Sequence, residues 1–159
     1  MKIRSLCCVS RLMTLVVTGF ITWVSLTEPS HFSGMKGWQW LLHLQQMTGV
    51  GIDKVIHFAL YFSLAFFIWL ALPQGVKRNL NRSLIVFSLA SLWGAGMEIL
   101  QLLGTQQGWW HRNFDWNDII ANVLGAAVST ILLMIIKKLR YSHEASWASI
   151  RTPSRRMKD

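Results

Sequence analysis

Acidic, basic and amide side chains recur at helical spacing in three separate segments of this chain. Asp53, His57 and Tyr61 follow one another at intervals of four residues, so a helix would carry all three on one face. The same kind of spacing joins two later groups, Glu98 with Gln101, and Asp115 with Asp118 and Asn122. Carboxylates, an imidazole and a phenol at one level can bind a polar ligand, transfer a proton or hold a metal ion.

We predict that these residues form one polar binding site, together with a lysine and an arginine beside them. Its members are Asp53, Lys54, His57, Tyr61, Glu98, Gln101, Arg112, Asp115, Asp118 and Asn122. Taken singly, the aspartates could cap helices and Asn122 could tie two helices together. So many polar residues in three segments favour a site over a set of unrelated structural contacts.

Three members of the predicted site, His57, Glu98 and Asp118, are the candidate catalytic residues. His57 or Glu98 would act as a general base with Asp118 orienting it, and Arg112 would stabilise developing negative charge. Asp53, with the three candidates, also has the oxygen and nitrogen atoms that metal ions bind. The sequence contains no compact ligand motif such as H-E-x-x-H, so we predict no metal and no other cofactor.

Long apolar segments must position these residues. The chain has 159 residues, of which 52% are hydrophobic and only 14% charged. The apolar residues fall in four segments, Leu6–Leu26, Val55–Leu72, Leu84–Leu103 and Ile119–Ile136. Each is close to the roughly 20 residues that a helix needs to cross a bilayer. We therefore predict an all-α, polytopic membrane protein: a single domain over residues 1–136, built as a bundle of four transmembrane helices, followed by a basic tail over 137–159.

Two further segments carry their own predictions. The tryptophan-rich stretch "GWQWLLHLQQM" (Gly37–Met47) predicts a segment that lies in the membrane interface after the first helix. The first apolar segment has the basic start of a signal peptide, but "SLTEPSHFSG" after it contains no clear small-x-small cleavage site. We therefore expect the first segment to remain as a membrane helix.

The distribution of charge predicts the orientation of the helices. The net charge is +9, and most of the 16 lysine and arginine residues lie before the first helix, between the second and third, and after the fourth. Under the positive-inside rule both termini are then cytoplasmic, and the polar site faces outward. Topology accounts for the basic residues, so we predict no nucleic-acid partner. Because an unpaired charge at bilayer depth costs about 2.5–3.5 kcal/mol, Glu98 must face the bundle interior.

Three motifs resemble the VanZ-like family of bacterial membrane proteins: "DKVIHFALYFSLAFF", "MEILQLL" and "RNFDWNDIIANVLGAAV". They match the patterns D-K-x-x-H-x-x-x-Y, E-x-x-Q and R-x-x-D-x-x-D-x-x-x-N-x-x-G, and they place the family pattern on the ten site residues and on Gly125. The resemblance is strongest over residues 51–136. It implies a four-helix protein of the cytoplasmic (inner) membrane and the cell envelope. It also implies an association with low-level resistance to teicoplanin, but it implies no particular reaction.

Three functional classes are compatible with this pattern, beside a purely structural or assembly role. The first is an outward-facing site for lipid headgroups, envelope precursors, glycopeptide-type antibiotics or an envelope protein, in which Lys54 and Arg112 hold phosphate or carboxylate. The second is a membrane-embedded hydrolase or transferase acting on an amphipathic envelope substrate. The third, a proton-coupled transporter using Glu98 and His57, is disfavoured because the cytoplasmic halves of all four helices are largely apolar. Membrane lipids are partners in every case, and the sequence predicts no oligomeric state.

Overall fold

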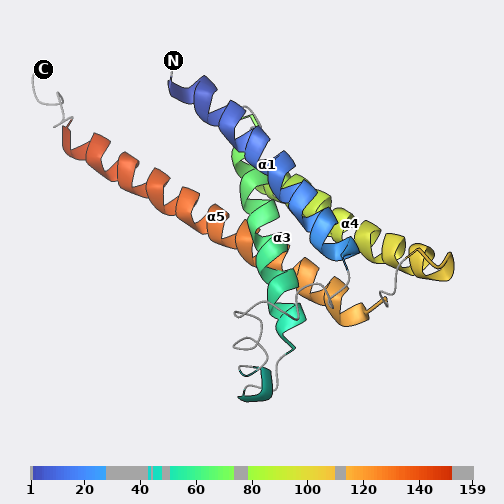
Figure 1. The fold of residues 1–159 in the computed structure, drawn as a ribbon. Helices are drawn as coiled ribbons and strands as arrows, with labels where there is room; N and C mark the ends of the chain where they lie inside the picture. The colour runs from blue at the N-terminus through green and yellow to red at the C-terminus, as the bar shows by residue number, and fades with distance from the viewer. Residues whose placement is uncertain are drawn as a thin grey trace, which may run out of the picture.

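The described part of the protein is a bundle of four long helices. The computed structural model describes residues 2–27, 43, 45–47, 51–73, 79–109 and 114–151. Within these ranges the helices are α1 (Lys2–Leu26), α3 (Ile52–Ala71), α4 (Asn79–Gln106) and α5 (Trp116–Arg151), and no described residue lies in a strand (Figure 1). The predicted all-α fold is confirmed. Of the predicted interfacial segment, His43 and Gln45–Met47 are helical; the remainder lies outside the described residues, and the interfacial placement stays a prediction.

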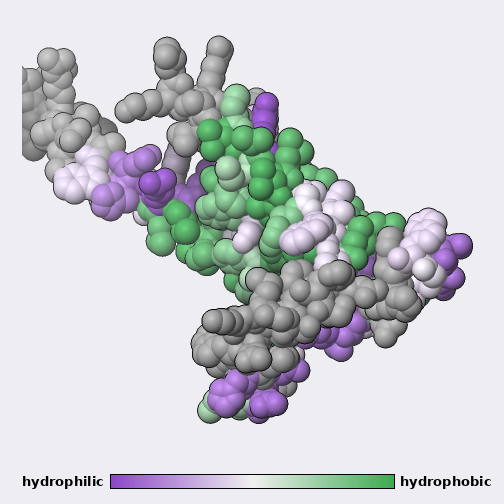
Figure 2. All heavy atoms as spheres, in the orientation of Figure 1, coloured by the Kyte–Doolittle hydropathy of each residue, from purple (hydrophilic) through white to green (hydrophobic). Residues whose placement is uncertain are grey.

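Each helix contains a stretch long and apolar enough to cross a membrane. These stretches are Cys8–Leu26, Ile52–Ala71, Leu80–Gln106 and Trp116–Glu144. Their outer faces carry large apolar side chains in the open, such as Leu15, Leu92 and Ile131. Figure 2 shows apolar residues covering the middle of one face, with hydrophilic residues gathered toward its ends. An apolar surface of this kind would promote aggregation in water, but it is the expected lipid-facing surface of a multi-pass membrane protein.

The helices are longer than the apolar segments of the sequence. The largest difference is at α5, which continues from the predicted end at Ile136 to Arg151, so the first part of the basic tail is helical. The reason is that hydropathy locates the membrane boundary, whereas a helix ends where its backbone is interrupted. After Gly125 no glycine or proline occurs before Pro153.

The second membrane helix is the centre of the bundle, because α3 packs against α1, α4 and α5. Its crossing with α5 depends on a glycine. A Cβ atom added to Gly125 would overlap the backbone carbonyl oxygen of Phe58 and would lie 3.0 Å from the amide nitrogen of Phe62. The absence of a side chain at Gly125 therefore lets the backbones of α3 and α5 come into direct contact.

A buried arginine of α4 caps the C-terminal end of α3. Arg82 of α4 is 5% exposed, and its Nη2 donates to the carbonyl oxygens of Trp69 and Leu72, the latter at 3.1 Å. Its guanidinium also lies 4.8 Å from the centre of the Trp69 ring. Carbonyls at a helix C-terminus have no partner within the helix, so Arg82 satisfies the end of α3 while its charge favours that end of the helix dipole.

Candidate functional site

The start of α3 and the start of α5 bring three of the predicted acids together around one lysine. The ammonium of Lys54 lies 2.5 Å from Asp115 Oδ2, 2.6 Å from Asp118 Oδ1 and 2.7 Å from Asp53 Oδ2. Asp53 is on α3, whereas the other two aspartates begin α5. Lys54 therefore neutralises carboxylates from two helices at once and ties the start of α5 to the start of α3.

Asp115 has a second role as the N-terminal cap of α5. Its Oδ1 accepts a hydrogen bond from the backbone N–H of Asn117 at 2.8 Å, and its carbonyl oxygen accepts one from the N–H of Asp118 at 3.1 Å. The hydrogen bond from Lys54 and the one from Asn117 hold the pKa of Asp115 below its usual range. The carboxylate of Asp115 is thus ionised at neutral pH and favours the positive end of the α5 dipole.

A buried layer lies beneath Lys54. His57 Nε2 is 3.6 Å from Asp118 Oδ2, and His57 Nδ1 is 3.0 Å from Asn122 Oδ1. His57 and Asp118 are each 6% exposed, and Asn122 is 1% exposed. Asp118 therefore contacts both Lys54 and His57, and the imidazole is held in one orientation by a carboxylate and an amide of α5.

Glu98 of α4 completes this layer. It is fully buried, as its position in an apolar segment predicts, and its Oε2 lies 3.4 Å from the backbone nitrogen of Asp115. One ligand atom each from His57, Glu98 and Asp118 lie within 4.8 Å of one another, so these residues have the donor atoms and the spacing to hold a cation. Asp53, Asp115 and Asp118 form a second such group, but the ammonium of Lys54 lies among their oxygens.

The deepest predicted residue, Tyr61, packs beside Asn122 against a glycine of α4. A Cβ atom on Gly94 would lie 3.0 Å from Tyr61 Cε1 and 3.1 Å from Asn122 Nδ2. Tyr61 is 1% exposed, and among the described residues neither its hydroxyl nor Asn122 Nδ2 has a hydrogen-bond partner. Gly94 therefore makes room for two polar side chains at this depth.

The model for the family described as VanZ/LLP1 matches residues 8–137, which is most of the chain. The protein belongs to the VanZ/LLP1 family. The family resemblance of its three motifs is thereby confirmed. Neither a search of curated proteins nor one of solved structures finds a match.

The remaining two predicted site residues of this VanZ/LLP1 protein are Gln101 and Arg112. Gln101 is fully buried, and its Nε2 donates to the carbonyl oxygen of Ser25 at 2.7 Å. Its amide nitrogen therefore satisfies a backbone carbonyl at the C-terminal end of α1. Arg112 lies outside the described residues, and its place in the site stays a prediction.

Sequence reasoning did not identify Ser25, because its contribution to this VanZ/LLP1 fold is a backbone carbonyl that any residue would supply. Gly94 shares a helix face with Glu98 and Gln101, at intervals of four and three residues, and this position predicts that the glycine admits bulky polar neighbours. In the structure the neighbours are Tyr61 and Asn122.

Proposed function

We propose that this VanZ/LLP1 protein lies in the bacterial cytoplasmic membrane with both termini inside, and that it binds the ammonium-bearing head of an amphipathic envelope molecule at its outer end. The binding surface is the acidic rim, which we define as Asp53, Lys54, Asp115 and Asp118. The observation that carries the proposal is the contact of Lys54 with three carboxylates at 2.5–2.7 Å.

These contacts favour a cationic ligand. The sequence allowed Lys54 to hold a phosphate or carboxylate, but its ammonium already donates to three acids. Three carboxylates and one ammonium leave the rim with an excess of negative charge. Asp53 and Asp115 keep 57% and 36% of their side chains exposed, so their free oxygens can accept hydrogen bonds from a ligand.

The surroundings of the rim suit the tail of an amphipathic molecule. Val55 follows Lys54 on α3 with 52% of its surface exposed, and Ile120 lies two residues after Asp118 on α5 with 54% exposed. Apolar side chains thus face outward directly below the acids. A primary ammonium would meet the carboxylates while its acyl chains stay in lipid, and an amino-bearing envelope precursor or glycopeptide-type antibiotic would use the same chemistry.

Two phospholipids that differ only in their N–H groups test the proposal. Purified protein in detergent would be titrated with phosphatidylethanolamine or phosphatidylcholine of identical chains, and bound lipid measured by native mass spectrometry. We expect stronger retention of phosphatidylethanolamine, because a quaternary ammonium has no N–H to donate. Asp115→Asn should reduce this preference several-fold while keeping the helix cap, since asparagine caps as well as aspartate.

Glu144→Gln is the matched control, because Glu144 is an exposed acid at the far end of α5. It should leave the preference unchanged. Equal retention of the two phospholipids by the wild-type protein, or an Asp115→Asn variant that still prefers phosphatidylethanolamine, would rule out ammonium recognition at the rim.

One observation favours a second candidate function, a membrane-embedded hydrolase or transferase. His57 is buried between Asp118 and Asn122, and a histidine oriented by a carboxylate is a common general base. Asp118→Asn would keep the shape of this pair and remove its charge. If the protein turns over a lipid-linked substrate, this variant should lose at least about tenfold in kcat; full activity in Asp118→Asn would exclude the pair from catalysis.

A further inference from the structure

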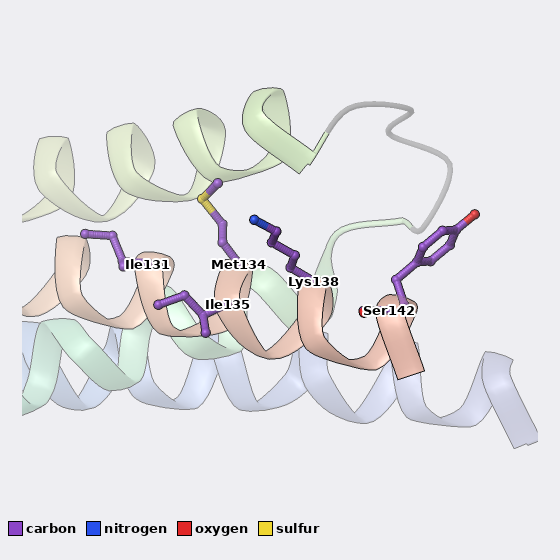
Figure 3. A pocket seen from close by; sticks show the side chains of 6 residues that line it. Ile131, Met134, Ile135, Lys138 and Ser142 are labelled. Carbon is purple, nitrogen blue, oxygen red and sulfur yellow. The ribbon is translucent and has the colours of Figure 1, made fainter. Parts of the chain in front are cut away.

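A groove lies at the opposite, basic end of the bundle, where α5 diverges from the other helices (Figure 1). Its volume is about 560 Å³, and the described residues that line it are on α5: Ile131, Met134, Ile135, Lys138, Tyr141 and Ser142. Their spacing repeats at three and four residues, so they form one continuous face of the helix. Figure 3 shows Met134 and Lys138 pointing from α5 toward the first turns of α4.

The groove changes from apolar to basic along the helix. Ile131, Met134 and Ile135 line the end of the groove nearer the middle of α5, and Lys138 follows one turn later along the helix. At about 1.5 Å per residue, the ammonium-bearing residue lies roughly 4–10 Å beyond these three along the helix axis. Tyr141 and Ser142 come last, and tyrosine is favoured where the hydrocarbon meets the headgroups.

We propose that this groove binds an anionic phospholipid of the leaflet at the basic end of the bundle. The phosphate would contact Lys138, and an acyl chain would lie on Ile131, Met134 and Ile135. Charge complementarity identifies the occupant: Lys138 is the cation that lines the groove, and a basic groove between membrane helices is a typical site for acidic headgroups. The groove is far from the acidic rim along α5, and the proposal does not depend on the function proposed for that rim.

Charge repulsion argues against a second copy of the chain as the occupant of the groove. A helix of the same chain would bring the same cationic end toward Lys138 if it packed in parallel, and like charges repel. A phospholipid supplies the opposite charge at the depth of Lys138 and an apolar chain at the depth of the isoleucines.

Native mass spectrometry tests this assignment with the full chain in detergent, titrated with phosphatidylglycerol or phosphatidylcholine of identical chains. We expect a single-lipid adduct that favours phosphatidylglycerol. Lys138→Ala should reduce phosphatidylglycerol binding by about fivefold, the effect of one basic residue near a membrane surface, and Lys138→Arg should retain it. Arg140→Ala is the matched control, because Arg140 belongs to the same end of α5 but does not line the groove.

A second variant tests the apolar part of the groove without changing its charge. Met134→Trp places a larger side chain in the groove and should weaken binding of both lipids, whereas Met134→Leu should not. Equal losses in Lys138→Ala and Arg140→Ala would mean general attraction to the basic end and would overturn the site. A dimer mass without lipid would assign the groove to a second copy instead. Asp115→Asn should leave phosphatidylglycerol binding intact, which separates this result from that of the acidic rim.

Discussion

At the residue scale, Lys54 forms ion pairs with three carboxylates. Removing its ammonium would leave Asp53, Asp115 and Asp118 facing one another at the ends of two helices. Because Lys54 is 26% exposed, water will screen part of the repulsion. We therefore expect Lys54→Met to lower the free energy of unfolding by about 1–3 kcal/mol, between the values for exposed and fully buried ion pairs.

A double-mutant cycle separates this electrostatic effect from lost packing. Asp118→Asn removes one of the three carboxylates, so the double variant Lys54→Met with Asp118→Asn should be less destabilised than the sum of the two single changes. The measurement is thermal or denaturant unfolding in detergent, followed by tryptophan fluorescence. Strict additivity would show that Lys54 and Asp118 do not stabilise one another.

The capping carboxylate of Asp115 gives the protein a defined dependence on pH. Lys54 and the N–H of Asn117 lower its pKa below the ordinary value of 3.8. A group whose pKa is lower in the folded state stabilises the protein fully above its unfolded pKa and loses that contribution as pH falls through the folded pKa. The contribution of Asp115 should therefore be complete above about pH 5, begin to fall near pH 4, and be lost as the pH falls below the lowered pKa of the folded state.

The comparison of wild type with Asp115→Asn isolates this contribution from the other acids of the site. Unfolding temperatures would be measured between about pH 6 and pH 3. The difference in unfolding temperature between wild type and Asp115→Asn should be constant down to about pH 5 and should shrink at lower pH. The reason is that only the wild type has a charge at position 115 that protonation removes. Parallel curves over the whole range would contradict the assignment.

At the scale of the helices, the contact of α3 with α5 positions the site, because Lys54 and His57 come from α3 and their partners Asp115 and Asp118 come from the start of α5. Gly125→Ala should destabilise the protein by about 2–3 kcal/mol, since its Cβ would meet the Phe58 carbonyl, which is backbone and cannot rotate away. Gly96→Ala is the matched control: nothing lies within 4 Å of its added Cβ, and alanine is the better helix former.

Unfolding of both variants in detergent, with wild type alongside, checks this prediction. Gly94→Ala should fall between them, because its Cβ would lie at 3.0 Å from Tyr61 and Asn122, whose side chains can shift slightly. If Gly125→Ala and Gly96→Ala had equal stability, the α3–α5 crossing would not depend on Gly125.

The helices also show what the sequence could predict and what it could not. The lengths of the apolar segments predict four membrane-spanning helices, and the spacing of the polar residues predicts which face of each helix is polar. Both predictions depend only on the sequence of the segment itself. The partners across helices depend on crossing geometry instead. The sequence therefore did not predict that Lys54 lies among three acids, that Gln101 donates to the end of α1, or that Arg82, counted only as a charge for topology, is buried against α3.

At the scale of the whole molecule, the two ends of the bundle have opposite chemistry. The acids Asp53, Asp115 and Asp118 lie at one end with Glu98 beneath them. The first turns of α1 and the last turns of α5 lie at the other end (Figure 1), and Lys137, Lys138 and Arg140 belong to the second half of α5. The positive-inside rule orients such a bundle with its basic end in the cytoplasm. In the orientation that we propose, the acidic rim is accessible from outside the cell, as the proposed binding of envelope molecules requires.

Cysteine labelling in intact cells tests this orientation. In a background with Cys7 and Cys8 changed to serine, Asn117→Cys would place a thiol beside the rim, where Asn117 is exposed, and Ser142→Cys would place one at the basic end. A membrane-impermeant maleimide should label Asn117→Cys in intact cells and Ser142→Cys only after permeabilisation. The reverse pattern would put the rim in the cytoplasm, and a ligand of the outer envelope could then not reach Lys54 and its three carboxylates.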